Sequence, residues 1–334
     1  MTLRIAINGF GRIGRSALRA LYEGDYRKRM QVVAINEPGD ARTMAHLLQY
    51  DSTHGRFSGS LSLAGETLTV NGDAIALTHH ERLDDLHWQD VDIVLECSGG
   101  YTAQADAEKH LAQGARRVMF SNPADPDIAA IVYGVNDELL SAAQTVISTA
   151  SCTSNCIIPV IQVLDKALGI ECGVLTTLHS MMNDQPVIDA YHHTDLRKTR
   201  SASESMIPVD TALAAGIGRV LPALAGKFEA QALRVPTTNV SAMDLTVVVK
   251  RDTTRNEVNA VLQRASETAP LKNILGFTTE PLASCDFNHD PRSGIVDASQ
   301  TRVSGQRLVK VLAWFDNEWA YANRMLDVAS RWKR

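Results

Sequence analysis

The sequence feature that most constrains the fold is a glycine-rich turn between two short runs near the start of the chain. The run LRIAI (3–7) is rich in β-forming residues and predicts a buried strand. NGFGRIGR follows, with Gly9, Gly11 and Gly14 in the spacing G-x-G-x-x-G, and SALRALYE (16–23) then has helical periodicity. This order is typical of a dinucleotide-binding turn, because glycines let the backbone approach a pyrophosphate and the helix N-terminus offers N–H groups to it.

A second strand is predicted over MQVVAINE (30–37), which ends in an acid. In dinucleotide-binding folds, a carboxylate at this place hydrogen-bonds to the ribose of the adenosine. Glu37 therefore favours NAD as the cofactor, since its charge would repel the 2′-phosphate of NADP. The alternative is that Glu37 is a solvated carboxylate in a loop.

Further strand-like runs alternate with helical stretches up to residue 151. They are VDIVLECSGG (91–100), RRVMFSNP (116–123), IAAIVYGVN (128–136) and QTVISTAS (144–151). This alternation predicts an α/β fold with a doubly wound, mostly parallel sheet of the Rossmann type. Small residues, Ser98 and Ser121 among them, follow two of the strands, at the edge of such a sheet that faces the ligand.

Two cysteines four residues apart lie in the stretch ISTASCTSNCIIPVI (147–161). Cys152 follows a predicted strand and lies at or near the N-terminus of a mostly apolar helix predicted over 153–168, whose dipole is expected to lower the pKa of the thiol. The helix and the return strand GVLTTLH (173–179) have similar lengths, so His179 comes back to the edge that carries Cys152. A thiol paired with an imidazole is the arrangement used in nucleophilic catalysis.

The other interpretations of the two cysteines are weaker. No second Cys/His pair has zinc-like spacing, so no metal is expected. A disulfide between Cys152 and Cys156 inside a helix is geometrically poor, and Cys156 is expected to be a small packed residue. We expect structural roles for Cys97, Cys172 and Cys285.

Composition limits the classes of partner and compartment. The length of 334 residues predicts two domains, and the net charge of −5 is spread over well-mixed residues, which gives no reason to expect nucleic acid or a membrane as partner. No apolar run has the length of a membrane span, and the N-terminus lacks a signal-peptide pattern. The odd number of cysteines argues against a disulfide framework, so we expect a reducing cytoplasm.

The pattern of the sequence changes after Ser151, where we place the domain boundary. Residues 1–151 are predicted to form the dinucleotide-binding domain, and residues 152–316 an α+β domain with a mixed or antiparallel sheet. Its strands are predicted over 228–235, 241–250, 293–303 and 307–316. The last segment, 317–334, is predicted to be a helix that returns to the first domain and brings Asn317 to the cofactor.

Five motifs together resemble the glyceraldehyde-3-phosphate dehydrogenase family: INGFGRIGR, YDSTHGRF, SCTSNC, RVPTTNVS and WFDNEWAYANRM. The likeness covers essentially the whole chain in the family's order and spacing. It implies an NAD-binding domain followed by a catalytic domain, usually in a homotetramer. It also implies that Cys152 attacks an aldehyde carbon, that His179 accepts a proton, and that the backbone N–H of Cys152 helps His179 to hold the oxyanion.

The resemblance also implies roles for residues at matching positions. Asn317 matches the residue at the nicotinamide carboxamide, Glu37 replaces the usual aspartate at the ribose, and Arg234 matches the phosphate-binding arginine. The implied cofactor-binding residues are Gly9, Phe10, Gly11, Arg12, Ile13, Glu37, Ser98, Ser121 and Asn317, and the implied substrate-binding residues are Ser151, Thr153, Arg197, Arg200, Thr211 and Arg234.

The sequence departs from the triose-phosphate enzyme where phosphate is recognised. That enzyme has threonines three and five residues after its histidine, and here Met182 and Asp184 stand in those places, while Ala212 replaces the glycine after Thr211. A carboxylate at Asp184 would repel a phosphate bound there. Together with HSMMNDQPVIDAYH and ASCDFNHDP, these changes resemble the erythrose-4-phosphate dehydrogenase branch of the family.

This branch implies NAD-dependent oxidation of D-erythrose 4-phosphate to 4-phosphoerythronate, a step of pyridoxal-phosphate synthesis. Water, rather than phosphate, then cleaves the cysteine thioester. Two alternatives stay open: the phosphorylating triose enzyme, and a nucleotide-binding interaction protein without useful catalysis.

Overall fold

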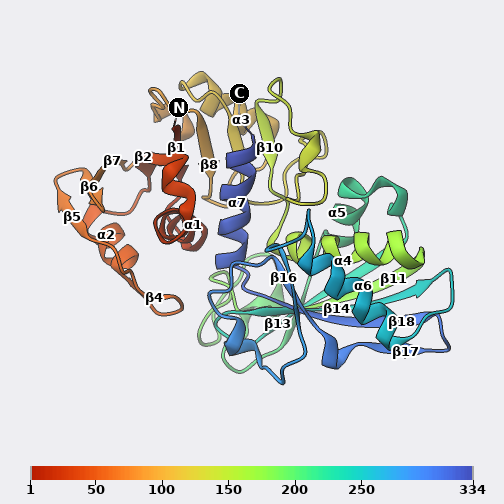
Figure 1. Ribbon diagram of the computed structural model, residues 1–334. Coiled ribbons are helices and arrows are strands. Elements are labelled where there is room, and N and C mark those ends of the chain that lie inside the picture. The colour runs from red at the N-terminus through yellow and green to blue at the C-terminus, as the bar shows by residue number, and fades with distance from the viewer. Residues whose placement is uncertain (1, 333–334) are drawn as a thin grey trace. The chain divides into compact units, whose positions relative to one another are not determined.

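In the computed structural model, which describes residues 2–332, the chain separates into two units between Ser151 and Cys152 (Figure 1). The first unit holds the residues up to Ser151 and those from Tyr321 onward, and the second unit holds Cys152–Ala320. Helix α7 (Trp319–Arg331) begins in the second unit and continues in the first. Asn317 therefore precedes α7 instead of lying inside the predicted helix.

The described residues of the first unit form an eight-stranded sheet in the order β10-β9-β8-β1-β2-β7-β6-β5. The successive pairs from β10 to β7 in this order are parallel, and the pairs β7–β6 and β6–β5 are antiparallel. The chain proceeds from β1 to β2 on one side and returns to β8 on the other, which confirms the doubly wound, mostly parallel sheet. The bounds are β1 Leu3–Asn8, β2 Met30–Asn36, β5 Leu61–Ala64, β6 Thr67–Val70, β7 Asp73–Thr78, β8 Ile93–Glu96, β9 Val118–Phe120 and β10 Val146–Ser148.

Three α-helices, α1 (Arg12–Glu23), α2 (Ala41–Gln49) and α3 (Gln104–Ala112), belong to the described part of this unit along with α7. The strand predicted over 128–136 is wrong, since only Ala130 makes an isolated bridge, to Ser148. The side chain of Asn136 closes a turn there, accepting a hydrogen bond from the backbone N–H of Val132 and donating one to the carbonyl of Ala130. A side chain that satisfies the local backbone in this way competes with strand pairing.

The second unit contains a mixed sheet whose described strands follow the order β12-β13-β11-β14-β18-β16-β15, with β17 paired to β18. The pairs β11–β13 and β15–β16 are parallel and the others antiparallel, as expected for an α+β fold. The predicted strand over 293–303 is two short strands separated by a helical turn. The bounds are β11 Ile170–Ser180, β12 Ile207–Val209, β13 Phe228–Val235, β14 Ser241–Val249, β15 Leu275–Thr278, β16 Gly294–Asp297, β17 Arg302–Ser304 and β18 Leu308–Phe315.

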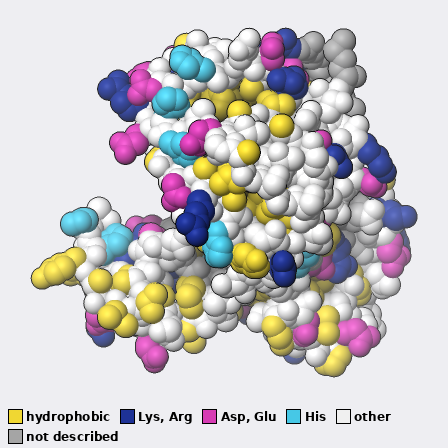
Figure 2. All heavy atoms as spheres, turned by 90° about the vertical axis from the view of Figure 1, so that its left-hand side faces the viewer, with side chains coloured by type: hydrophobic (Ala, Val, Ile, Leu, Met, Phe, Trp, Pro, Cys, Tyr) yellow, Lys and Arg dark blue, Asp and Glu magenta, His cyan; other side chains and the backbone are white. Residues whose placement is uncertain are grey.

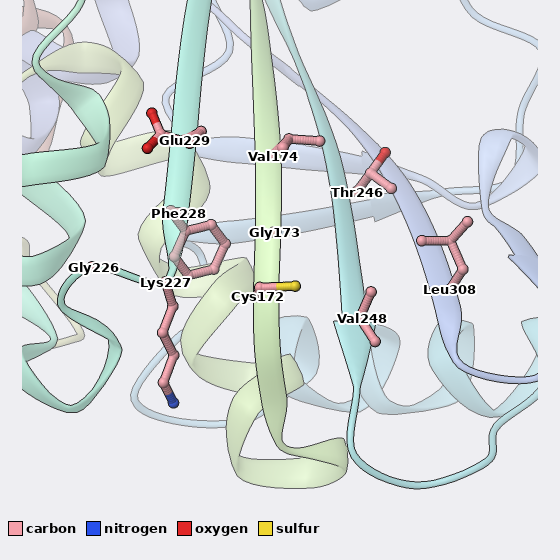
Figure 3. A pocket seen from close by; sticks show the side chains of 10 residues that line it. All are labelled: Cys172, Gly173, Val174, Gly226, Lys227, Phe228, Glu229, Thr246, Val248 and Leu308. Atoms are coloured by element: carbon pink, nitrogen blue, oxygen red, sulfur yellow. The ribbon is translucent and has the colours of Figure 1, made fainter.

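One face of this mixed sheet carries the apolar helix α4 (Cys152–Leu168), which packs on β14 and β18, and α6 (Arg255–Glu267), which packs on α4 (Figure 1). The opposite face holds a shallow hollow of about 360 Å³, lined by residues that include Val174, Phe228 and Leu308 (Figure 3). Two neighbouring residues of β11 differ in burial according to their face of the sheet: Leu175, on the helix-covered face, is 1% exposed, and Val174, on the opposite face, is 55% exposed. This second face therefore presents apolar groups to its surroundings.

The charges on the face of the molecule drawn in Figure 2 are mixed, as the composition suggests. Among the described residues drawn in Figure 2, basic and acidic side chains are interspersed, and no broad area of them has one sign only. The helices of the described segment 2–332 also include none with the length and apolar character that crossing a bilayer requires.

Candidate active site

The thiol of Cys152 and the imidazole of His179 face each other within the second unit. Cys152 is the first residue of α4, and His179 is the penultimate residue of β11. The distance between Cys152 Sγ and His179 Nε2 is 3.7 Å. The other ring nitrogen, Nδ1, lies 2.8 Å from the carbonyl oxygen of Ser180, to which it donates its proton. This contact fixes the tautomer in which the Nε2 lone pair faces the thiol.

The electrostatics of this pair differ from what the helix dipole alone suggests. Burial raises the pKa of the Cys152 thiol to about 12, although the backbone N–H groups of Thr153 and Cys152 act in the opposite direction. The expected lowering of the thiol pKa is therefore wrong for the free protein, because desolvation outweighs the helix terminus. Burial also lowers the pKa of His179. The resting pair is a neutral thiol beside a neutral imidazole, which can act as its base.

A cluster of charges lies beside this pair. Strand β13 runs parallel to β11 with Arg234 opposite His179, and Arg234 is 7% exposed. Its guanidinium holds Asp184 with two hydrogen bonds, of 2.5 and 3.1 Å, and Lys198 Nζ lies 2.9 Å from the same carboxylate. Burial raises the pKa of Asp184, but the hydrogen bonds from Arg234 and Lys198 bring it down to about 2. The carboxylate of Asp184 is therefore already paired with two cations, Arg234 and Lys198, next to His179.

The remaining residues of the predicted substrate site are more scattered. Arg200 is exposed and pairs with Asp189 at 3.0 Å, and Arg197 is exposed on a helical turn. Thr211 accepts a hydrogen bond from the backbone N–H of Leu213. Thr153 follows Cys152 in α4, whereas Ser151 belongs to the first unit.

Lys198 is a residue that the sequence reasoning missed. It lies in the segment DLRKTR between Arg197 and Arg200, the two arginines that the resemblance implies bind substrate. A run of basic residues does not reveal which member turns inward. Only the fold shows that Lys198, rather than its neighbours, reaches the carboxylate held by Arg234.

The five cysteines, all within the described residues, are free. Cys156 is fully buried, and a Cβ atom at Gly294 would lie 2.9 Å from both its carbonyl oxygen and its sulfur. Cys156 is therefore a packed residue at the contact of α4 with β16. Cys172 and Cys285, for which we expected structural roles, are exposed on the surface.

Asn317 follows β18, and its amide oxygen faces two serine hydroxyls. The hydroxyl of Ser180 lies 3.0 Å and that of Ser241 lies 2.9 Å from Asn317 Oδ1. All three residues belong to the second unit.

In the first unit, the glycine-rich turn opens onto a hollow of about 450 Å³ at the carboxyl ends of β1 and β8. Gly9, Gly11, Glu37 and Ser98 line it together. Gly9 has a φ of +88°, and a Cβ atom there would lie 2.4 Å from the backbone nitrogen of Ser98, so only glycine fits. A hollow at the point where the strand order reverses, floored by bare backbone, suits a dinucleotide.

The other predicted cofactor residues surround this hollow or support it. Glu37 accepts a hydrogen bond of 2.6 Å from the backbone N–H of Phe10, which ties the end of β2 to the turn. The guanidinium of Arg12 is engaged by both carboxylate oxygens of Asp51. Ile13 lies partly buried in α1. Ser121 lies after β9 and hydrogen-bonds to Cys97, which lines the hollow.

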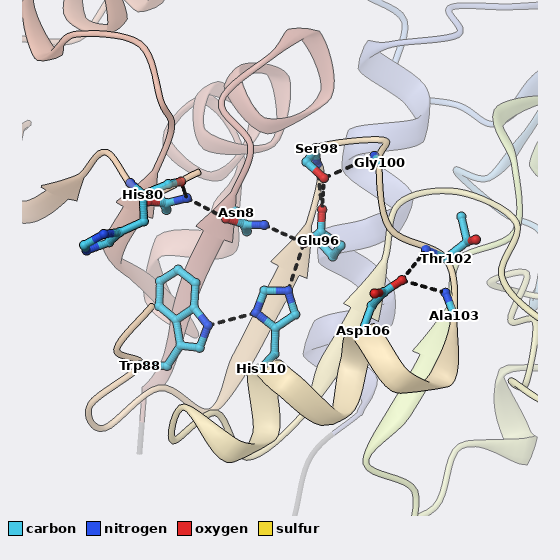
Figure 4. A network of polar contacts seen from close by, with 11 residues as sticks. Asn8, His80, Trp88, Glu96, Ser98, Gly100, Thr102, Ala103, Asp106 and His110 are labelled. Atoms are coloured by element: carbon cyan, nitrogen blue, oxygen red, sulfur yellow. Dashed lines mark hydrogen bonds and ion pairs between the residues drawn. The ribbon is translucent and has the colours of Figure 1, made fainter. Parts of the chain in front are cut away.

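A buried network supports the same turn (Figure 4). Glu96, which ends β8 and is 0% exposed, accepts hydrogen bonds from Asn8 Nδ2 and from both the backbone N–H and the hydroxyl of Ser98. His110 Nε2 lies 2.9 Å from the same carboxylate, and the indole N–H of Trp88 donates to His110 Nδ1. Because Nδ1 accepts, His110 is neutral and donates through Nε2. Four donors thus converge on one buried carboxylate, which sequence reasoning did not select.

Two comparisons with protein-family models agree with this geometry. Residues 3–104 match the model described as glyceraldehyde 3-phosphate dehydrogenase, NAD binding domain. Residues 151–317 match the model described as glyceraldehyde 3-phosphate dehydrogenase, C-terminal domain.

Proposed function

Because this chain belongs to the glyceraldehyde-3-phosphate dehydrogenase family, and so binds NAD and oxidises a phosphorylated aldehyde with it, we propose that its substrate is D-erythrose 4-phosphate. The product would be 4-phosphoerythronate. The proposal rests on the residue types that this chain carries around the family's reaction centre.

The observation that carries the proposal is the carboxylate of Asp184 between Arg234 and Lys198, beside His179. A phosphorylated aldose needs a cation for its own phosphate; Arg234, on the neighbouring strand, is paired with Asp184 in this structure, so the substrate's phosphate would have to replace this carboxylate on the guanidinium. A second anion, inorganic phosphate, would be repelled by Asp184 if it approached the same cations. This arrangement favours a reaction in which the substrate brings the only phosphate.

The proposed chemistry uses Cys152 and His179. The sulfur of Cys152 attacks the aldehyde carbon while His179 Nε2 takes the thiol proton and returns it to the new oxyanion, so that a hemithioacetal and a neutral imidazole result. NAD, when bound, supplies the hydride acceptor. Loss of hydride from carbon, with the hydroxyl proton passing to His179, leaves a thioester on Cys152. Water then adds to the thioester carbon, and the carbon–sulfur bond breaks to release the acid and the thiol.

The proposed cofactor contacts follow the hollow of the first unit. Backbone N–H groups of the turn from Gly11 to Ile13 would hold the pyrophosphate, since those of Gly9 and Phe10 donate to Asn36 and Glu37, and Glu37 would hold the adenosine ribose. Ser98 and Ser121 would line the rest of the cofactor-binding hollow. Asn317 would donate to the nicotinamide carboxamide.

We further propose a homotetramer that works in the cytoplasm, in pyridoxal-phosphate synthesis. Two apolar surfaces of the second unit support self-association. One is the hollow shown in Figure 3, and the other is the segment 182–206, where Val187, Ile188 and Tyr191 are exposed. Apolar areas of this kind are typical of subunit interfaces.

A paired substrate assay tests the proposed function. Purified protein with NAD should reduce the cofactor with erythrose 4-phosphate and should not need inorganic phosphate. A much higher kcat/KM with glyceraldehyde 3-phosphate, seen only when phosphate is added, would support the phosphorylating triose enzyme instead. If Cys152→Ala retained full turnover, the covalent mechanism would be wrong.

A further inference from the structure

Two buried serines, Ser180 and Ser241, hold the side chain of Asn317 through their hydroxyls. Ser180 ends β11, Ser241 begins β14 and Asn317 follows β18, and these three strands are neighbours in the mixed sheet. Ser180 is 0% exposed and Ser241 is 1% exposed. Their hydroxyls lie 3.0 and 2.9 Å from the same atom, Asn317 Oδ1. Both lone pairs of this oxygen are therefore used from inside the protein.

In the structure the amide oxygen of Asn317, and not its NH2 group, faces both serine hydroxyls, which donate to it. The hydroxyl oxygen of Ser241 accepts the backbone N–H of Ser180 at 3.0 Å and has its proton for Asn317. Nδ2 is consequently turned away from the serines, and it has no hydrogen-bond partner among the described residues.

Ser180 also anchors the base. Its carbonyl oxygen receives the proton of His179 Nδ1 at 2.8 Å, while its hydroxyl reaches Asn317. One residue thus sets the orientation of the imidazole through its backbone and that of the amide through its side chain.

We propose that Ser180 and Ser241 are positioning residues that hold the Asn317 amide with Nδ2 outward, as a donor for the carboxamide oxygen of NAD. This inference rests on the proposed contact between Asn317 and the nicotinamide. Without the serine hydroxyls the amide rotates freely, and half of its orientations present an oxygen to the carboxamide oxygen.

A double-mutant cycle measured by NAD binding tests this inference. Calorimetry would give the dissociation constant of NAD for the wild type, Ser180→Ala, Asn317→Ala and the double variant. We expect Ser180→Ala to weaken binding about three- to tenfold, the range for one lost hydrogen bond. In the Asn317→Ala background the same change should have no effect, because the serine acts only through the amide.

A second readout reports on the amide itself. Thionicotinamide adenine dinucleotide replaces the carboxamide oxygen by sulfur, a weaker acceptor, so the wild type should prefer NAD and Ser180→Ala should lose most of that preference. The rate at which iodoacetamide labels Cys152 should stay within about twofold, since the backbone contact to His179 remains. Ser293→Ala is the matched control, because the buried hydroxyl of Ser293 has no partner in the described part of the chain.

The outcomes separate two kinds of failure. If Ser180→Ala weakened NAD binding equally in the wild-type and Asn317→Ala backgrounds, the positioning role of Ser180 would be wrong, while the proposed contact of Asn317 with the nicotinamide would stand. If Asn317→Ala leaves NAD affinity unchanged, the proposed nicotinamide contact fails and the inference fails with it, while the substrate proposal stands on its own assay. Should Ser180→Ala not fold, Ser241→Ala enters the same cycle with the same expectations.

Discussion

His179 Nε2 lies 3.7 Å from Cys152 Sγ, and the opposite nitrogen of the ring is committed to the carbonyl of Ser180. The imidazole therefore has one orientation and one tautomer, and its only role toward the thiol is that of an acceptor. Since burial raises the pKa of the thiol and lowers that of the imidazole, reactivity at Cys152 depends on a base in contact.

Replacing His179 by Asn should remove this base. We expect kcat to fall by about 10²–10⁴-fold, the usual range for a general base, and alkylation of Cys152 by iodoacetamide to slow as well. The exposed His193 offers a matched control, since His193→Asn should change neither rate. Undiminished alkylation of Cys152 in His179→Asn would show that the thiol is activated by something else.

The acid limb of the pH profile should lie below the usual range of histidine. Burial lowers the pKa of His179, so its neutral, basic form persists below about pH 6.5, where an ordinary histidine is half protonated. The profile of kcat/KM against pH reports the free enzyme and is the measurement to make. An acid limb centred above pH 7 would contradict the buried, neutral imidazole.

Asp184→Asn tests whether this carboxylate competes with phosphate. The change frees the guanidinium of Arg234, so we expect inorganic phosphate to inhibit at about tenfold lower concentration, a change of about 1.4 kcal/mol. The pKa of Asp184, about 2, keeps the wild-type carboxylate charged at any ordinary assay pH. Asp189→Asn, in the same segment but paired with Arg200, is the control. Weaker phosphate inhibition in Asp184→Asn would mean that the carboxylate supports Arg234 instead.

Glu37→Gln should relax the choice of cofactor. The amide oxygen of Gln can still accept the N–H of Phe10, so the variant removes the charge and keeps the contact. We expect the ratio of kcat/KM for NADP to that for NAD to rise about tenfold, because a 2′-phosphate is no longer repelled. Glu81→Gln, an exposed acid that lines the same hollow, should leave the ratio unchanged. An equal rise in both variants would show that only the net charge matters.

Glu96→Gln should destabilise the first unit. The amide NH2 of Gln would face donors where the carboxylate now accepts four hydrogen bonds. Leaving such buried groups unpaired costs about 2–4 kcal/mol in the free energy of unfolding. Urea unfolding measures it, with Glu108→Gln on the exposed side of α3 expected to stay within about 0.5 kcal/mol. A loss as small as that of the control would mean that the network contributes little.

The sequence predicted those parts of the fold where periodicity is strong. The strand predicted over 228–235 coincides with β13, and that over 241–250 differs from β14 by one residue, because apolar residues alternate there. The strand predicted from the apolar run 128–136 is wrong, because the side chain of Asn136 stabilises a turn there that the hydrophobic pattern does not indicate. Contacts across neighbouring strands could not be read from the sequence either. The position of Arg234 opposite His179 depends on the register of β13 against β11, and the network of Glu96 depends on β1 and β8 being adjacent.

The most direct test of the account is the acyl group on Cys152. Protein mixed with NAD and erythrose 4-phosphate is quenched in acid after increasing times, and the peptide that contains Cys152 is weighed by mass spectrometry. We predict a 4-phosphoerythronyl thioester on Cys152 that decays at the same rate with and without inorganic phosphate. No adduct on Cys152, or an adduct that persists until phosphate is added, would contradict the proposed hydrolysis by water.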